Sequence, residues 1–421
     1  MKHLFKITFI CFLLSQATAW ASYVFIPMNE DQQKDHLKAY GIAYWVLQND
    51  VEIDWLLNYE GVSFLVKHAP QIEKECLIRG VSYEVISSKR ASDILAQIAH
   101  PESNADAVKL QKAPKVAVYS PKNKLPWDDA VTMALTYAEI PYDIIYDDEI
   151  LSDLLPMYDW LHLHHEDFTG QYGKFYRFYK NAPWYIQQKK DYEADAAKHG
   201  FAKVSEQKLA VAQRIKEFTA GGGFLFAMCS ATDSYDIALA ATGIDICHPM
   251  FDGDPIDGSA QSKLDFSQSF AFKDFKLVTD PNIYEFSTID VTRTRKVKEP
   301  QDFFTLFEFS AKWDPVPTML CQNHTQIIKG FMGQTTSYDK KLIKSEVLIM
   351  GENKSANEAK YIHGNFGKGM WTFYGGHDPE DYQHKVGDPK TELELHPNSP
   401  GYRLILNNIL FPAAKKKKQK T

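Results

Sequence analysis

The segment 221–243 passes directly from a short apolar run into a helical pattern, and it reads GGGFLFAMCSATDSYDIALAATG. Residues 224–228 contain no polar side chain, which is typical of a strand covered on both faces of a sheet. Ser230, Thr232 or Asp233 can each cap the helix that follows, and a glycine ends it. The segment therefore predicts a buried strand that enters a helix through a tight turn.

Other β-rich runs alternate with helical patterns along the chain. Residues 206–218, for example, place Leu209, Ala212 and Ile215 on one helix face, and 129–139 is also helical in pattern. This alternation predicts an α/β protein with a mostly parallel, doubly wound sheet. The runs that predict strands lie at 23–26, 62–66, 83–86, 116–119, 142–145, 160–164, 224–228, 347–350 and 370–374.

The polar stretch 99–114 contains two prolines and few large apolar residues, which indicates a boundary. We therefore expect a smaller N-terminal α/β unit at 22–112 and a main domain at 113–412. A basic tail follows at 413–421.

The first 21 residues have the pattern of a secretory signal peptide. Lys2 and Lys6 precede an apolar stretch at 7–14, and Ala19 and Ala21 form an A-x-A-like cleavage site. We expect cleavage near Ala21 and a periplasmic or secreted protein. No later apolar stretch has the length of a membrane span.

Charge and cysteine content exclude several classes. The net charge is −7, and the lysines of the tail leave the rest of the chain more acidic still, which argues against a nucleic-acid partner. Cleavage would leave Cys76, Cys229, Cys247 and Cys321, whose wide spacing fits neither a disulfide scaffold nor a Cys-x-x-Cys site. The main interpretation assigns no metal and no cofactor, and the oligomeric state stays open.

Cys229 is the last residue before the predicted helix. The amide groups and the dipole at a helix start favour thiolate over thiol, and they can hold a developing oxyanion. A plain buried cysteine is the alternative.

A second polar group follows a later strand. Residues 370–374 are mostly apolar, and two glycines then lead to His377, Asp378 and Glu380. Because the carboxyl ends of parallel strands meet at one edge of a sheet, His377 can lie beside Cys229 and take its proton. Asp378 or Glu380 can orient the imidazole ring.

These two segments resemble the class I glutamine amidotransferase-like superfamily, whose members pair a Gly-x-Cys-x-Gly elbow with a late His-Pro-Glu. The resemblance covers 115–412 and implies a flavodoxin-like sheet. It also implies that Cys229 attacks an amide, that His377 acts as base and then acid, and that Glu380 orients His377.

Two features depart from that pattern. Ala227 and Ala231 stand at the elbow glycines, and Asp378 separates His377 from Pro379. Some superfamily members are inactive, so a second interpretation is a non-catalytic protein that binds a small molecule or a sugar-related ligand. The C-terminal end also resembles secreted Bacteroidetes proteins labelled asparagine synthetase B, although the pyrophosphate loop of such synthetases is incomplete here.

The run 159–167 reads DWLHLHHED and supplies a third interpretation. On a strand His162 and His164 share one face, and with His165 they could ligate zinc for a metal-dependent hydrolase. The resemblance instead places this loop beside the Cys229 pocket. There we expect a small-molecule amide to contact Ser230, His164, His165, Glu166 and Asp378.

Overall fold

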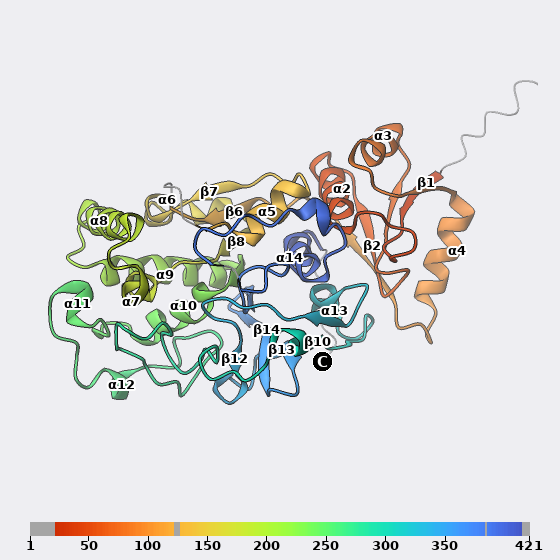
Figure 1. The fold of residues 1–421 in the computed structure, drawn as a ribbon. Helices are drawn as coiled ribbons and strands as arrows, with labels where there is room; N and C mark the ends of the chain where they lie inside the picture. Colours follow the sequence, from red (N-terminus) through yellow and green to blue (C-terminus); the bar gives the residue numbers. More distant parts are fainter. Residues whose placement is uncertain (1–21, 122–126, 384, 415–421) are drawn as a thin grey trace, which may run out of the picture.

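The computed structural model describes residues 22–121, 127–383 and 385–414, which form two sheets with helices around them (Figure 1). The predicted signal peptide and most of the basic tail lie outside the described residues. Among the helices that are described, none has the length and apolarity that crossing a membrane requires.

Residues 22–110 form a small antiparallel sheet with helices on both faces. Its elements are β1 (Ser22–Ile26), α2 (His36–Gln48), β2 (Ile53–Leu57), β3 (Phe64–Lys67), α3 (Pro70–Arg79), β4 (Glu84–Ser87), α4 (Ser88–Ala99) and β5 (Asp106–Leu110). The strand order is β4-β1-β3-β2-β5. Val24 packs in the same apolar cluster as α2, whereas its neighbour Phe25 packs with α4. Strand β5 falls within 99–114, so that stretch is not only a linker.

The second sheet contains a parallel half. Its strands are β6 (Val116–Tyr119), β7 (Asp143–Ile145), β8 (Trp160–Leu163), β9 (Phe224–Met228) and β15 (Gly369–Tyr374). They pair side by side in the order β7-β6-β8-β9-β15, all parallel. Numbered as they occur in the chain, this is the 2-1-3-4-5 order of flavodoxin-like sheets. The predicted α/β class is confirmed.

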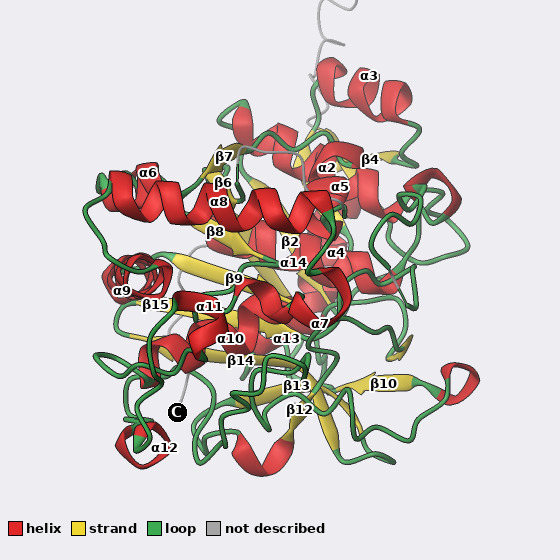
Figure 2. Ribbon diagram, turned by 60° about the vertical axis from the view of Figure 1, so that its left-hand side comes forward, coloured by secondary structure: helices red, strands yellow, loops and turns green. Residues whose placement is uncertain are grey.

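An antiparallel half, of which the sequence predicted only the strand at 347–350, continues the sheet beyond β15. It consists of β10 (Phe303–Leu306), β11 (Ile327–Lys329), β12 (Tyr338–Asp339), β13 (Leu348–Asn353) and β14 (Glu358–Phe366). These strands follow in the order β14-β13-β10-β11, and β12 also pairs with β14. Figure 2 shows the strands in yellow among the helices.

Helices cover both faces of the parallel half. They and the remaining helices are α5 (Ala130–Tyr137), α6 (Asp147–Leu151), α7 (Tyr176–Tyr179), α8 (Pro183–Lys198), α9 (Val204–Gly221), α10 (Ser230–Ala240), α11 (Pro249–Asp252), α12 (Ala260–Lys263), α13 (Pro315–Cys321) and α14 (Pro400–Leu410). Ala227 of β9 packs in the apolar cluster of α9 and α10, whereas Met228 packs in that of α5 and α14. Both faces of β9 are therefore buried, which explains its unbroken apolar run.

Helix α14 joins the two sheets. It packs against α2, α5 and α13, and in Figure 1 the blue α14 lies next to the red α2. One apolar cluster contains Val24 of the first sheet, Met228 of the second and Leu404 of α14. The buried Arg403 donates hydrogen bonds to the hydroxyl of Tyr40, at 3.2 Å, and to the carbonyl of Gly61. The two sheets thus share one core.

Candidate active site

Cys229 occupies a strained turn between β9 and α10. Its φ is 50° and its ψ is −138°, a left-handed conformation that a side chain with a Cβ rarely adopts. Cys229 is itself the N-cap residue of α10, so the predicted caps at Ser230, Thr232 and Asp233 lie within the helix instead. Ala227 and Ala231, the two alanines on either side of the predicted elbow, are both fully buried, and the elbow forms with them in place.

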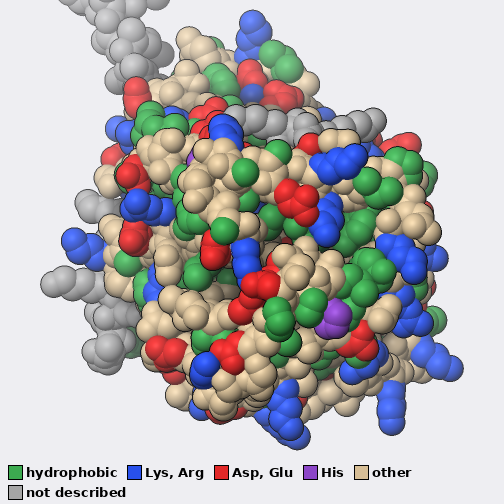
Figure 3. Space-filling model, turned by 90° about the vertical axis from the view of Figure 1, so that its left-hand side faces the viewer, with side chains coloured by type: hydrophobic (Ala, Val, Ile, Leu, Met, Phe, Trp, Pro, Cys, Tyr) green, Lys and Arg blue, Asp and Glu red, His purple; other side chains and the backbone are tan. Residues whose placement is uncertain are grey.

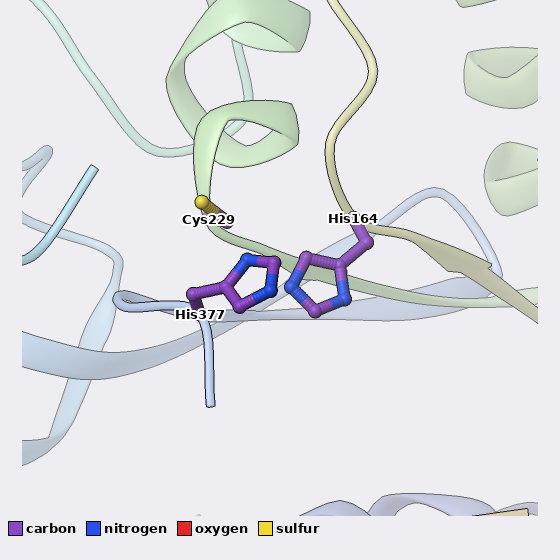
Figure 4. A group of neighbouring side chains, drawn as sticks. All are labelled: His164, Cys229 and His377. Carbon is purple, nitrogen blue, oxygen red and sulfur yellow. The ribbon is translucent and has the colours of Figure 1, made fainter. Parts of the chain in front are cut away.

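His377 follows β15, which is the parallel neighbour of β9. Tyr374 of β15 pairs with Met228 of β9. The sulfur of Cys229, one ring nitrogen of His377 and one of His164 all lie within 4.8 Å of one another. Figure 4 shows the sulfur and the His377 ring turned toward one another, with the His164 ring facing His377 from the other side. The structure therefore brings the predicted thiol and imidazole together.

The carboxylate beside His377 belongs to Asp128, which the sequence analysis did not single out. Asp128 Oδ1 lies 3.8 Å from His377 Nε2, and both side chains are buried. Glu380 was expected in this role, but its Oε2 lies 3.1 Å from Nδ1 of His396. The orienting group of the histidine is thus Asp128, a correction to the prediction.

The additional residue at Asp378 accounts for this difference. Its fully buried carboxylate accepts hydrogen bonds from the Glu380 amide at 2.9 Å, from the Tyr402 hydroxyl at 2.8 Å and from the Thr391 hydroxyl at 2.7 Å. Asp378 therefore anchors the loop after β15 to α14, and that loop turns Glu380 toward His396.

Residues 331–336, which we name the strap, approach Cys229 from the antiparallel half. The Gln334 amide donates a hydrogen bond to the sulfur at 3.3 Å, and the Thr335 amide also lies against it. The strap is fastened at both ends, because the buried ammonium of Lys360 donates to the carbonyls of Phe331 and Thr336. The strap is a loop without a periodic pattern, so the sequence gives no signal for it.

Hydrogen bonds and charge favour an ion pair between Cys229 and His377. Burial raises the pKa of the Cys229 thiol, but the hydrogen bond and charge of His377 and the strap amides outweigh it, so this pKa lies below its usual value. Burial by itself lowers the pKa of His377. The hydrogen bonds to Asp128 and to the Cys229 sulfur have the larger effect and raise this pKa to about 10. Both directions favour thiolate beside imidazolium.

The Asp129 carboxylate contacts two of the predicted zinc ligands, His162 and His164. Its Oδ2 lies 3.2 Å from Nε2 of His162 and 3.3 Å from Nδ1 of His164. The other nitrogen of His162 lies 3.2 Å from the carbonyl oxygen of Phe226, so both nitrogens of His162 face protein oxygens. His162 is therefore unsuited to bind a metal ion.

A cavity of about 330 Å³ opens beside the sulfur. Ser230 and His165, two of the predicted binding residues, line it together with Cys229 and His377. Its wall is completed by aromatic, amide and small side chains: Trp127, Phe175, Tyr284, Thr292, Met332, Gly333, Gln334, Gln383 and Val386. The cavity has room for part of a small organic molecule.

Glu166 does not belong to this cavity. Burial raises the pKa of its carboxyl to about 8, an effect that Lys208 opposes and Asp147 reinforces. Lys208 and Asp147 themselves form a buried ion pair with a closest N–O distance of 2.8 Å. Glu166 is buried and is not among the residues that line the cavity, so the structure does not place it where the sequence predicted a ligand contact.

No protein-family model and no curated protein matches this sequence. Among solved structures, the chain is similar to the cytoplasmic proteins STM3548 and STM1381 of Salmonella typhimurium, at 11% and 12% identity and a TM-score of 0.34 for each. Each match covers 72% of this chain and 100% of the other. Gan42B, a GH42 β-galactosidase from G. stearothermophilus, matches at 11% identity and a TM-score of 0.27 over 63% of this chain and 28% of its own. Matches at these TM-scores assign no function.

Proposed function

We propose that this protein is a cysteine-dependent hydrolase that acts on an amide or a related carbonyl group of a small molecule, as the resemblance to glutamine amidotransferase-like proteins implies. One observation carries the proposal: the Cys229 sulfur, on a strained elbow, lies beside the ring of His377, which the Asp128 carboxylate backs. A nucleophile, a base and an orienting acid in this arrangement are the parts that acyl transfer requires.

The proposed reaction has two steps. The Cys229 thiolate attacks the carbonyl carbon, and the carbonyl electron pair moves to the oxygen. His377 then donates its proton to the leaving nitrogen as the C–N bond breaks, which leaves an acyl-enzyme. Neutral His377 next takes a proton from water, the resulting hydroxide attacks the thioester, and Cys229 leaves as thiolate. Asp128 stabilises each imidazolium that forms.

The start of α10 supports the oxyanion in this proposal. Amide groups in the first turn of a helix point out of its N-terminus and favour negative charge. Ser230 is the first residue of α10 and lines the cavity beside the sulfur. Its amide is therefore our candidate donor to the carbonyl oxygen.

The proposal includes export, which the predicted signal peptide supports, and it includes no nucleic-acid partner. Figure 3 shows acidic and basic side chains interspersed on the face drawn there, rather than gathered into one basic area. The net charge of −7 also opposes binding to phosphate groups.

Covalent labelling tests the proposal. We expect a glutamine-analogue diazoketone or a small chloroacetamide to label Cys229, with the site identified by mass spectrometry. Cys229→Ala should abolish the labelling, and His377→Gln should slow it at least about 100-fold because the thiolate loses its partner.

Cys247→Ala is the matched control. Cys247 is also a buried thiol, but burial and nearby aspartates raise its pKa well above the usual value. Its removal should leave labelling unchanged. Equal labelling of the wild type and of Cys229→Ala would refute the proposal. Labelling of Cys229 without any His377-dependent amide turnover would favour the non-catalytic interpretation.

A further inference from the structure

A second histidine, His164, lies near Cys229 and has no role in the proposed hydrolysis. His164 is 1% exposed, and no described residue forms a hydrogen bond with its Nε2. A buried polar atom without a partner is costly, so such an atom calls for an explanation. In Figure 4 the His164 ring points toward the ring of His377, and the Cys229 sulfur lies next to that same ring.

Each histidine has a carboxylate on its far nitrogen. Asp129 Oδ2 lies 3.3 Å from Nδ1 of His164, and Asp128 Oδ1 lies 3.8 Å from Nε2 of His377. Histidines that bind metal ions almost always have a carboxylate or carbonyl at the other ring nitrogen, which fixes the ring and makes it more basic. Here two neighbouring histidines have that arrangement.

The spacing also suits a metal ion. In a tetrahedral zinc site, bonds of about 2.0 to 2.3 Å place neighbouring ligand atoms about 3.4 to 3.7 Å apart. The sulfur of Cys229 and one nitrogen each of His164 and His377 already lie within 4.8 Å of one another, so small side-chain rotations would bring them together. Cys229 and His377 line the cavity, so a fourth position could open toward solvent or ligand.

We propose that Cys229, His164 and His377 bind one divalent transition-metal ion of the zinc type, and that the bound ion blocks the nucleophile. The metal–sulfur bond takes the electron pair of the thiolate. The proton held between Cys229 and His377 passes to solvent, so that the imidazole lone pair can bind the ion. The inference concerns the ligand set and the accessibility of the thiol, and it does not depend on the proposed hydrolase activity.

Cobalt titration of the metal-free mature protein tests the ligand set. We expect one equivalent of Co²⁺ to bind, with a thiolate-to-cobalt charge-transfer band and the visible bands of tetrahedral Co²⁺. Cys229→Ser should lose the charge-transfer band. Asp129→Asn should weaken binding about 10- to 100-fold, the usual cost of losing a carboxylate that supports a ligand, and His164→Ala should weaken it at least as much. Circular dichroism checks that each variant is folded.

A second group of possible metal ligands supplies the control for the cobalt titration. Asp245, Cys247 and Asp252 also lie close together, but the ammonium of Lys203 is bonded to both aspartates, at 2.6 and 3.1 Å. Cys247→Ala should leave Co²⁺ binding unchanged. A charge-transfer band that persists in Cys229→Ser but disappears in Cys247→Ala would overturn the proposal, as would the absence of stoichiometric binding.

Protection from alkylation separates the metal site from the enzyme activity. Zn²⁺ should slow chloroacetamide labelling of the wild type, and a chelator should restore it. In His164→Ala, protection should require about 10- to 100-fold more Zn²⁺, judged against the same variant without metal. Rapid labelling that Zn²⁺ does not affect would refute the metal site and leave the hydrolase proposal standing. Stoichiometric metal binding by a protein that turns over no amide even in its metal-free form would do the reverse.

Discussion

At the scale of single residues, the site depends on a backbone conformation that its own side chain disfavours. Cys229 has a φ of 50°, and conformations of this kind cost about 1 to 3 kcal/mol for residues with a Cβ. The cost persists only because β9 and α10 are both buried and hold the turn from either side. Strain at the residue proposed as nucleophile accords with the tendency of strained residues to cluster at functional sites.

Substitution of Cys229 makes this strain measurable. Cys229→Gly should be more stable than Cys229→Ala by about 1 kcal/mol, because glycine adopts a positive φ without steric cost. Urea denaturation of the two variants gives the difference. Ala238→Gly is the control, since Ala238 lies inside α10. There glycine should destabilise by about 1 kcal/mol, and a loss of stability at both positions would show that the elbow is unstrained.

His363 should make the stability of the fold depend on pH. Its ring is buried on β14, and burial lowers its pKa to about 4. As the pH falls below about 6.5, the unfolded chain takes up a proton at this residue and the folded protein does not, so stability is lost. The contribution is present at pH 7.5 and should fall by about 2 kcal/mol at pH 5.

The variant His363→Gln isolates this contribution. The difference in unfolding free energy between pH 7.5 and pH 5 should shrink by about 2 kcal/mol relative to the wild type. His100→Gln, which alters an exposed histidine, should leave the difference unchanged. If His363→Gln also leaves it unchanged, the ring takes up a proton as readily in the folded protein as in the unfolded chain.

At the scale of elements, the local patterns predicted β9, α10 and β15 well and the antiparallel half poorly. Apolar runs bounded by glycines mark the buried strands at 224–228 and 370–374. By contrast, β14 has the sequence EAKYIHGNF, in which charged side chains are buried by partners distant in sequence, such as Arg295 with Glu358 at 2.7 Å. No periodic pattern marks a strand whose polar residues are paired in this way.

The strap is an element whose position should control the thiol. A Cβ on Gly333 would lie 2.8 Å from the amide nitrogen of His377 and 2.9 Å from the carbonyl carbon of Gly376. Gly333→Ala must therefore displace the strap, with its Gln334 amide, from the Cys229 sulfur. We expect labelling of Cys229 to slow by at least about tenfold, since small displacements at reacting groups are costly.

Gly258→Ala is the matched control for the strap. A Cβ at Gly258 would meet no atom within 4 Å, so this variant should label at the wild-type rate. Kinetics of chloroacetamide labelling, with circular dichroism as a check on folding, compares the two variants. Unchanged labelling in Gly333→Ala would mean that the strap amides do not influence the thiol.

At the scale of the whole molecule, the two sheets should fold together. The sequence predicts a smaller α/β unit at 22–112, and the first sheet does come from these residues. Its helix α2, however, packs on α14 in a cluster that also contains residues of β6 and β9. Removal of one unit would expose the apolar surface of the other.

A truncated chain tests this dependence. Residues 113–421 alone should show no cooperative thermal transition by circular dichroism, because the faces of α5 and α14 that α2 covers would lie open to water. A chain of residues 22–421 should show one cooperative transition. Cooperative unfolding of the truncated chain at a similar temperature would show instead that the main domain is independent.

The sequence by itself determined the α/β class, the elbow at Cys229 and the position of His377 after a parallel strand. These follow from local patterns, namely apolar runs, glycines and the rule that parallel strands end at one edge. Only the tertiary structure decided that Asp128 rather than Glu380 backs the histidine, that the strap reaches the sulfur, and that one core joins both sheets. Those contacts join residues far apart in the chain. No local pattern encodes them, because the packing of the whole fold decides which distant residues meet.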